Sequence, residues 1–347
     1  MKKFPNISHI DPNSLDGLNH LGKFLVDVQF LSGAIPSNQD GSHDPWDHLE
    51  ALMGLTTLGY KTQALKGLNW MVSNQNQDGS WYNLYQDEKP LELNKQTNYA
   101  AYVAVAVWHF YLINNDVNFL QEFWEPVKKG ILFSLSLQHD NGAIAWNIDE
   151  FEKIDEDYLL TGCSSIAKSL ECAIAICQAL GDQNYESEWR IAHSKLIAAL
   201  ENPSGIFDLK KDRSRFSMDW YYPILGGINS QKRINSLTTK IKDSFWIQGL
   251  GIKCVSHEPW VTVAETSECS IAYKKIGKDK IALELLHNAI SIVDSKGIPY
   301  MGWQFHENIY WPDETPSWTS AACILAADAN NRLTSGAGLF LKQQFKS

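Results

Sequence analysis

A short pattern that returns six times along the chain constrains the fold more than any other feature. In each copy a glycine-marked turn and a brief β-like stretch lead, through a polar loop, into an apolar helix rich in small residues. The glycine-marked segments are NQDGSHDPW, NQDGSWYN, HDNGAIAW, NPSGIFDL, GLGIKCV and SKGIPYMGW. The helices that follow are expected to begin near residues 47, 98, 164, 219, 264 and 318. Each interval between these starts has room for two helices and their connections.

The two kinds of helix in each interval differ in pattern. The six small-residue helices are apolar nearly all round, which is typical of buried helices. The stretches between them, such as KTQALKGLNWMVSNQ and DKIALELLHNAISIV, are amphipathic with one charged face. This alternation favours an all-α fold, an (α/α)6 toroid of six helical hairpins with an inner ring, an outer ring and short β-like loop segments. An open solenoid of stacked hairpins is the alternative.

The fourth unit is the weakest copy of the pattern. Pro223 and the pair Gly226-Gly227 are expected to end its inner helix early, because proline and glycine break helices. No low-complexity linker divides the chain, so we expect one α/α barrel domain over residues 1–347.

The inner helices all follow the long loops, so their N-termini should converge on one mouth of the barrel. Free N–H groups and the positive ends of the helix dipoles point to such a mouth. Residues at the helix starts are therefore candidates for a site. Four acidic residues stand there as candidate catalytic groups: Asp219, Asp47, Asp44 and Glu265. For each one alone, capping of a helix is an equally good interpretation.

Aromatic side chains gather at the same positions. Eight of the 13 tryptophans fall at the expected mouth, namely Trp46, Trp81, Trp146, Trp220, Trp260, Trp303, Trp311 and Trp318. The further residues that we expect to bind substrate there are His48, Tyr82, Tyr99, Cys163, Tyr221 and Tyr222. One such tryptophan usually fastens a loop to the barrel, but the whole set favours a pocket lined by aromatic rings.

Composition excludes several classes of partner. The net charge is -10 with no basic block, which argues against nucleic acid and against an anionic membrane surface. No apolar run is long enough for a transmembrane helix, and Met1–Pro12 lacks the order of a signal peptide. Six scattered cysteines without a CxxC pair favour reduced thiols and a cytoplasmic protein. We expect no metal and no cofactor, because HDPWDH has neither HExxH nor CxxC spacing.

Acids beside aromatic rings suit two chemistries. A polyene cyclase needs a shielded, protonated carboxyl to protonate an alkene, and aromatic faces that stabilise carbocations. A glycoside hydrolase needs paired carboxylates, and tryptophans stack on sugar rings. A non-catalytic module that binds a lipid or a glycan is a third possibility, which would need no acid.

The NQDGSW segment resembles the QW-type repeat of terpene cyclases and prenyltransferases, and the alternating helices are similar to their barrel. The chain resembles a single-domain class II terpene cyclase of the merosterolic acid synthase kind. That resemblance implies meroterpenoid biosynthesis: metal-independent, acid-initiated cyclisation of a small hydrophobic substrate, a prenylated aromatic acid. It leaves room for transient membrane contact and indicates no oligomeric state. The DxDD motif of these cyclases is absent, and DPWD at 44–47 or SMDW around Asp219 holds its place. The cyclase is our main hypothesis here, and the glycoside hydrolase is the alternative.

Overall fold

The structure, a computed structural model, describes residues 10–346. Residues 1–9, most of the segment tested above for a signal peptide, and residue 347 lie outside the described part. Twelve α-helices occupy the described residues. They are α1 (Leu15–Val28), α2 (Pro45–Thr57), α3 (Lys61–Asn74), α4 (Thr97–Asn114), α5 (Val117–Leu135), α6 (Leu160–Leu180), α7 (Glu186–Glu201), α8 (Met218–Gly226), α9 (Gln231–Lys240), α10 (Val263–Lys275), α11 (Asp279–Ala289) and α12 (Ser317–Asn331).

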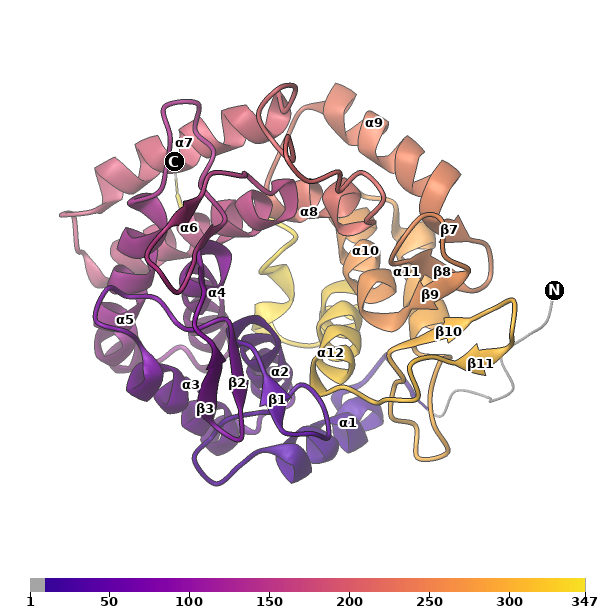
Figure 1. Ribbon diagram of the computed structural model, residues 1–347. Helices are drawn as coiled ribbons and strands as arrows, with labels where there is room; N and C mark the ends of the chain where they lie inside the picture. The colour runs from indigo at the N-terminus through magenta and orange to yellow at the C-terminus, as the bar shows by residue number, and fades with distance from the viewer. Residues whose placement is uncertain (1–9, 347) are drawn as a thin grey trace.

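The even-numbered helices form the inner ring of a closed barrel. Each contacts the next one in order, and α12 contacts α2, which closes the ring (Figure 1). The predicted all-α toroid is confirmed. Each inner helix begins within four residues of its expected start, and α8 ends at Gly226 after only nine residues, as Pro223 and the glycine pair predict.

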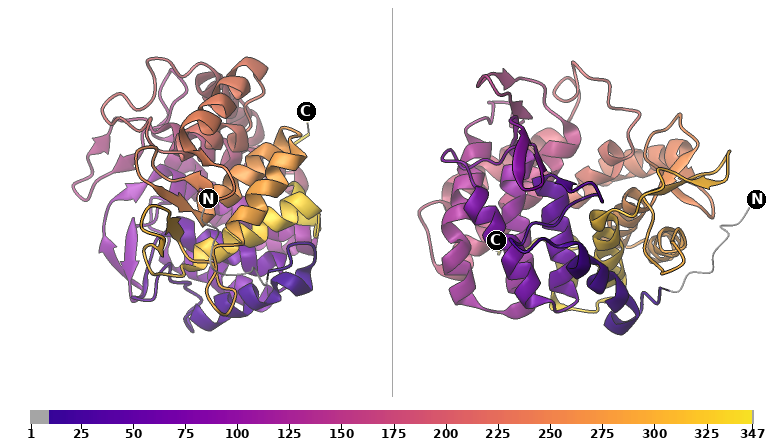
Figure 2. Two further views of the ribbon diagram at one scale, coloured as in Figure 1. Left: turned by 90° about the vertical axis from the view of Figure 1, so that its right-hand side faces the viewer. Right: turned by 60° about the horizontal axis from the view of Figure 1, so that its bottom comes forward.

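Short strands fill the loops that lead into the inner helices. The three sheets are antiparallel and have the orders β1-β2-β3, β4-β5-β6 and β11-β10-β9-β8-β7. The strands are β1 (Ser42–His43), β2 (Leu84–Gln86), β3 (Lys89–Glu92), β4 (Lys95–Gln96), β5 (Asn147–Ile148), β6 (Ile154–Asp155), β7 (Trp246–Ile247), β8 (Gly251–Lys253), β9 (Trp260–Thr262), β10 (Gly302–Gln304) and β11 (Ile309–Tyr310). The side view in Figure 2 places strands toward one end of the barrel and the C-terminus toward the other.

Three glycine turns, at Gly33, Gly79 and Gly142, join a loop to an outer helix. Gly79 has a φ of +94°, and a Cβ there would collide with the carbonyl oxygen of Lys129 on α5. The Gln75 side chain donates to the carbonyls of both Gly79 and Pro126, at 3.0 Å each. Gly33 and Gly142 have the same arrangement, with the glutamine four residues before each glycine. The NQDGSW segment therefore serves to pack a loop against an outer helix of this barrel.

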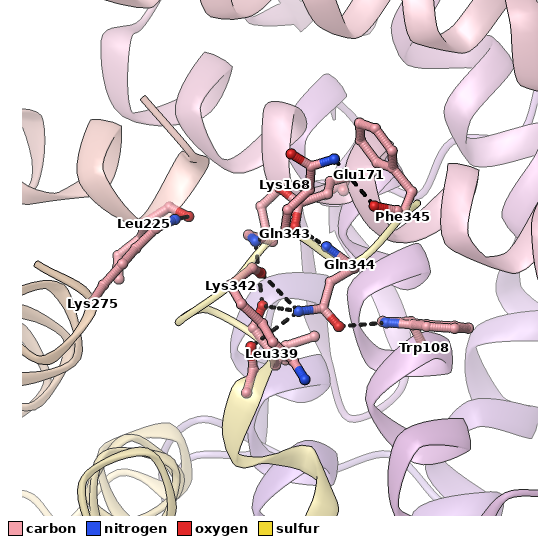
Figure 3. A network of polar contacts seen from close by, with 12 residues as sticks. Trp108, Lys168, Glu171, Leu225, Lys275, Leu339, Lys342, Gln343, Gln344 and Phe345 are labelled. Atoms are coloured by element: carbon pink, nitrogen blue, oxygen red, sulfur yellow. Dashed lines mark hydrogen bonds and ion pairs between the residues drawn. The ribbon is translucent and has the colours of Figure 1, made fainter. Parts of the chain in front are cut away.

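The C-terminal segment closes the base of the barrel (Figure 3). It begins with a 3-10 turn, η2 (Ser335–Gly338). The side-chain oxygen of Gln344 accepts a hydrogen bond from the Trp108 indole at 2.9 Å, and its backbone N–H donates to Glu171 at 2.8 Å. Glu171 also pairs with the buried Lys168 ammonium at 2.7 Å. The C-terminal segment and these polar contacts thus fill the base of the barrel. A site is therefore expected at the opposite end.

Among the described residues, only α6 is long and apolar enough to span a membrane. Its apolar stretch is entirely buried inside the protein, where it packs between α4 and α8. Burial in the inner ring accounts for its apolar composition.

Candidate active site

A cavity of about 340 Å³ opens at the mouth where the inner helices begin. Its lining comes from all six inner helices and from the loops before them. The lining residues are Asp44, Trp46, Asp47, Glu50, Gln96, Asn98, Tyr99, Trp146, Leu159, Thr161, Gly162, Arg213, Met218, Ala264, Glu265, Glu268 and Trp318. Five of them are carboxylic acids, on α2 and its N-cap and on α10, which are separated in the ring by α12.

Asp44 and Asp47 stand at the start of α2. Asp44 is the N-cap, and its carboxylate accepts a hydrogen bond from the Asp47 backbone N–H at 2.8 Å. Burial raises the pKa of Asp44 to about 6, although hydrogen bonds from the backbone and from Tyr99 oppose the shift. Burial and then the Asp44 charge raise the pKa of Asp47 well above its usual value. Both effects favour the protonated form of Asp47.

Glu265 faces the same cavity from the first turn of α10. It is 8% exposed, and its Oε2 atom has no hydrogen-bond partner within residues 10–346. A buried carboxylate oxygen without a partner is costly unless a ligand or water satisfies it. Glu265 is thus positioned to accept a proton or a hydrogen bond from a bound molecule.

A second pair of acids lies one helical turn deeper. Glu50 follows Asp47 by three residues, and Glu268 follows Glu265 by three. Glu50 accepts hydrogen bonds from the Trp46 indole at 2.9 Å and from the Tyr102 hydroxyl at 3.4 Å.

Two tyrosines bind the other member of this pair. Glu268 accepts hydrogen bonds from the Tyr221 hydroxyl at 2.5 Å and from the Tyr222 hydroxyl. Burial raises the pKa of Glu268 to about 7. Burial and then Glu268 raise that of Glu50 well above its usual value. Both carboxyls at the floor of the cavity are therefore harder to ionise than an exposed glutamate.

Aromatic rings form part of the wall. Trp46, Tyr99, Trp146 and Trp318 line the cavity. Trp46 stacks on Tyr102 with ring centroids 4.4 Å apart and planes at 4°. The cavity thus offers flat apolar faces beside charged groups.

Asp219 lies at the edge of this cavity. Its side chain is buried, accepts a hydrogen bond from Thr161 and faces Arg213, whose Nε is 3.5 Å from its Oδ2. Thr161 and Arg213 line the 340 Å³ cavity, whereas Asp219 lines a neighbouring one. Burial raises the pKa of Asp219, and the positive charge of Arg213 opposes that shift.

The structure brings part of the predicted binding set to the cavity and places the rest elsewhere. The cavity is lined by Trp46, Tyr99, Trp146 and Trp318. Two further members of the set, Tyr221 and Tyr222, donate hydrogen bonds to Glu268 at the floor of the cavity. The others lie in the barrel core, the loops or other hollows: His48, Trp81, Tyr82, Cys163, Trp220, Trp260, Trp303 and Trp311.

Hydrogen bonds and ring contacts explain these other positions. The Trp81 indole donates to the Met71 carbonyl at 2.8 Å, and His48 accepts from the backbone of Ile35 at 3.0 Å. Trp260 donates to the Trp311 carbonyl at 2.6 Å, and the two rings meet edge to face. These residues fasten loops or helices together.

Sequence reasoning missed Glu50, Glu268 and Arg213. A signal for the two glutamates exists, because each follows a candidate acid at the mouth by three residues and so lies on the same face of its helix. Arg213 stands in a loop, and no periodicity marks it. Within residues 10–346 no group of three or more His, Cys, Asp and Glu side chains is arranged to hold a metal ion.

The chain is 38% identical over 317 residues to the MMP endo-(1,4)-3-O-methyl-alpha-D-mannosidase of Mycolicibacterium hassiacum, covering 91% of this chain and 86% of that protein. This chain belongs to the family of that mannosidase. A scan against profiles of known protein families finds no match.

Solved structures of several glycosidases share this fold. A glycosidase variant in complex with glucose matches with a TM-score of 0.71 at 13% identity, over 93% of this chain and 97% of that one. The GH63 mannosylglycerate hydrolase of Thermus thermophilus, also in complex with glucose, matches with a TM-score of 0.70 at 10% identity, over 89% and 99%.

Membership of the mannosidase family corrects the main hypothesis from sequence. The resemblance to terpene cyclases and prenyltransferases is wrong, and with it the meroterpenoid cyclase activity and the prenylated hydrophobic substrate. The glycoside hydrolase alternative is the one that the relative supports. The misleading signal was NQDGSW, in which Gly79 serves a turn and Trp81 a packing contact.

Proposed function

We propose that this protein is a glycoside hydrolase that cleaves α-(1,4) linkages between 3-O-methylmannose units. The single observation that carries the proposal is the set of carboxyls from α2 and α10 around one aromatic-lined cavity in a member of the mannosidase family. A hydrolase needs one carboxyl that donates a proton and another that accepts one.

Asp47 is the proposed general acid. Burial and the neighbouring Asp44 charge favour its protonated form, and a general acid must carry a proton near the working pH. As the bond between the anomeric carbon and the glycosidic oxygen breaks, the Asp47 proton moves to that oxygen and the leaving sugar departs as an alcohol.

Glu265 is the proposed general base. Its Oε2 atom, without a hydrogen-bond partner among the described residues, is free to take a proton from water. The hydroxide oxygen bonds to the anomeric carbon as the glycosidic bond breaks, so one water is consumed for each bond. The two carboxyls then exchange their proton through solvent, and the anomeric configuration of the product is inverted.

Glu50 and Glu268 are proposed to bind the hydroxyl groups of the innermost sugar. Each keeps lone pairs beyond those used by Trp46, Tyr102, Tyr221 and Tyr222. The aromatic wall suits a methylated sugar, because an O-methyl group is apolar and packs on Trp and Tyr faces. The excess of tryptophan at the mouth fits this substrate.

The test is hydrolysis of an α-(1,4)-linked 3-O-methylmannose hexasaccharide, followed by mass spectrometry and by NMR of the newly formed anomer. The wild-type protein should release shorter chains with inverted configuration. Asp47→Asn and Glu265→Gln should each lose at least about 1,000-fold in kcat/KM, since both proton transfers are required. Absence of cleavage by the wild-type protein, or full activity in both variants, overturns the proposal.

We propose the cytoplasm as the compartment. The six cysteines are free, and five of them are buried, which fits a reducing environment.

A further inference from the structure

A second and larger cavity, of about 530 Å³, lies beside the candidate active site. Its walls are the start of α6, the loop after α7, the first turn of α8 and the start of α9. The lining residues are Leu160, Asn202, Pro203, Ser204, Gly205, Phe207, Asp208, Asp212, Arg213, Ser214, Asp219, Trp220 and Arg233.

One short chain of side chains connects the two cavities. Arg213 lines both of them. Asp219 lines the larger cavity, faces Arg213 at 3.5 Å and accepts a hydrogen bond from Thr161, which lines the smaller one. Arg213, Asp219 and Thr161 therefore stand between the two cavities, which lie side by side.

Several polar atoms around the larger cavity are buried without a hydrogen bond to any residue in 10–346. They are Oδ1 of Asp208, Oδ2 of Asp219, Nε of Arg213 and Nε of Arg233. Asp219 is only 3% exposed, and its separation of 3.5 Å from Arg213 is at the long limit of a hydrogen bond. Buried groups of this kind are costly unless a ligand or water pairs with them.

The missing partner must both donate and accept. Asp208 Oδ1 is an acceptor and Arg233 Nε a donor without a hydrogen bond, whereas Asp219 Oδ2 and Arg213 Nε have only each other, as an ion pair too long for a hydrogen bond. A sugar hydroxyl has one donor and two acceptor sites, so a ring with several hydroxyls can satisfy both kinds. Trp220 adds an aromatic face, and its indole is fixed by donation to the Ser214 carbonyl at 2.9 Å.

We propose that the larger cavity is an outer sugar-binding subsite, which holds a unit of the same oligosaccharide whose reacting unit lies in the smaller cavity. The proposal rests on the proposed function. It makes Trp220, Arg233 and Asp208 determinants of substrate length, and it provides the second binding position that cleavage within a chain requires.

The test compares two substrates with Trp220→Ala and Arg233→Met. The first substrate is the 3-O-methylmannose hexasaccharide, which the proposal places across both cavities. The second is 3-O-methyl-α-mannosyl fluoride, a single sugar that fits the smaller cavity alone. Lys232→Met is the matched control for Arg233→Met, because Lys232 is the exposed neighbour of Arg233 on α9. Phe151→Ala, at a side chain that is 81% exposed, controls for Trp220→Ala.

For both variants kcat/KM on the hexasaccharide should fall at least tenfold, mainly through KM, while hydrolysis of the fluoride stays within twofold of wild type. The two controls should match wild type on both substrates. An equal loss on both substrates, or no loss on the hexasaccharide, overturns the subsite.

Failure of the proposed function gives a different result, because the wild-type protein then hydrolyses neither substrate. In that case hexasaccharide binding is measured by calorimetry, and the subsite requires at least tenfold weaker binding by Trp220→Ala and Arg233→Met. Equal binding by the wild type and the variants refutes it.

Discussion

Replacement of Asp44 by asparagine should shift the pH dependence of hydrolysis without unfolding α2. Asparagine caps a helix about as well as aspartate, so the hydrogen bond to the Asp47 backbone N–H is preserved. The substitution removes a carboxylate whose pKa is about 6 and whose charge helps Asp47 to keep its proton. The pKa of Asp47 should therefore fall.

The size of the shift follows from the spacing of the two residues. Side chains three residues apart on a helix lie about 6 Å from each other. At an effective dielectric constant of ~20, two unit charges at that distance interact by about 3 kcal/mol, which corresponds to about 2 pH units. Asp44 lines a cavity that opens to solvent, so we expect about half of this value, roughly 1 pH unit.

The assay is kcat/KM on the hexasaccharide between pH 4 and 9. A general acid works only in its protonated form, so activity is lost as the pH rises through the pKa of Asp47. In Asp44→Asn this basic limb should lie about 1 unit lower, with the low-pH rate kept within severalfold. An unshifted basic limb would refute the role of Asp47, and loss of activity at every pH would assign the chemistry to Asp44.

Three further predictions concern the floor of the site and the frame of the barrel. Glu268→Gln should lower kcat/KM about tenfold, mainly through KM, because a sugar ligand loses a charged hydrogen-bond acceptor. An effect confined to kcat would contradict a binding role for Glu268. Gly79→Ala should destabilise the protein by at least ~2 kcal/mol more than Gly59→Ala in urea unfolding. Both glycines have positive φ, but only at Gly79 would a Cβ meet a backbone carbonyl. Lys168→Met should lower the free energy of unfolding by about 3–5 kcal/mol, because Glu171 loses its ammonium partner. The double variant Lys168→Met with Glu171→Leu should recover most of that loss. A double variant less stable than Lys168→Met alone would contradict the account.

The barrel could be predicted because its signals are local and repeated. Glycines with a positive φ, such as Gly79 and Gly142, occupy tight turns that favour glycine. These turns recur before runs of small apolar residues. The short α8 follows from Pro223 and its glycine pair for the same reason. The location of the site at the mouth follows from the polarity of the inner helices, and Asp44, Asp47 and Glu265 all line the cavity there.

The choice of chemistry could not be predicted in the same way. Trp46 and Trp81 both stand in glycine-marked segments, yet one lines the cavity and the other lies in the core, because the difference depends on three-dimensional packing. Acids beside aromatic rings stabilise a carbocation or bind a sugar equally well, so residue types alone left both open. Glu50 and Glu268 would have favoured the sugar, since a deep ring of carboxyls suits hydroxyl groups better than a hydrocarbon.

A crystal structure of the wild-type protein with a thio-linked 3-O-methylmannose disaccharide tests the central claim most directly. The sulfur replaces the glycosidic oxygen and resists hydrolysis, so every side chain remains native. The account predicts the disaccharide in the 340 Å³ cavity, with the sulfur beside the Asp47 carboxyl and a water between Glu265 and the anomeric carbon. A disaccharide bound elsewhere, or one whose sulfur lies out of reach of Asp47, would contradict it.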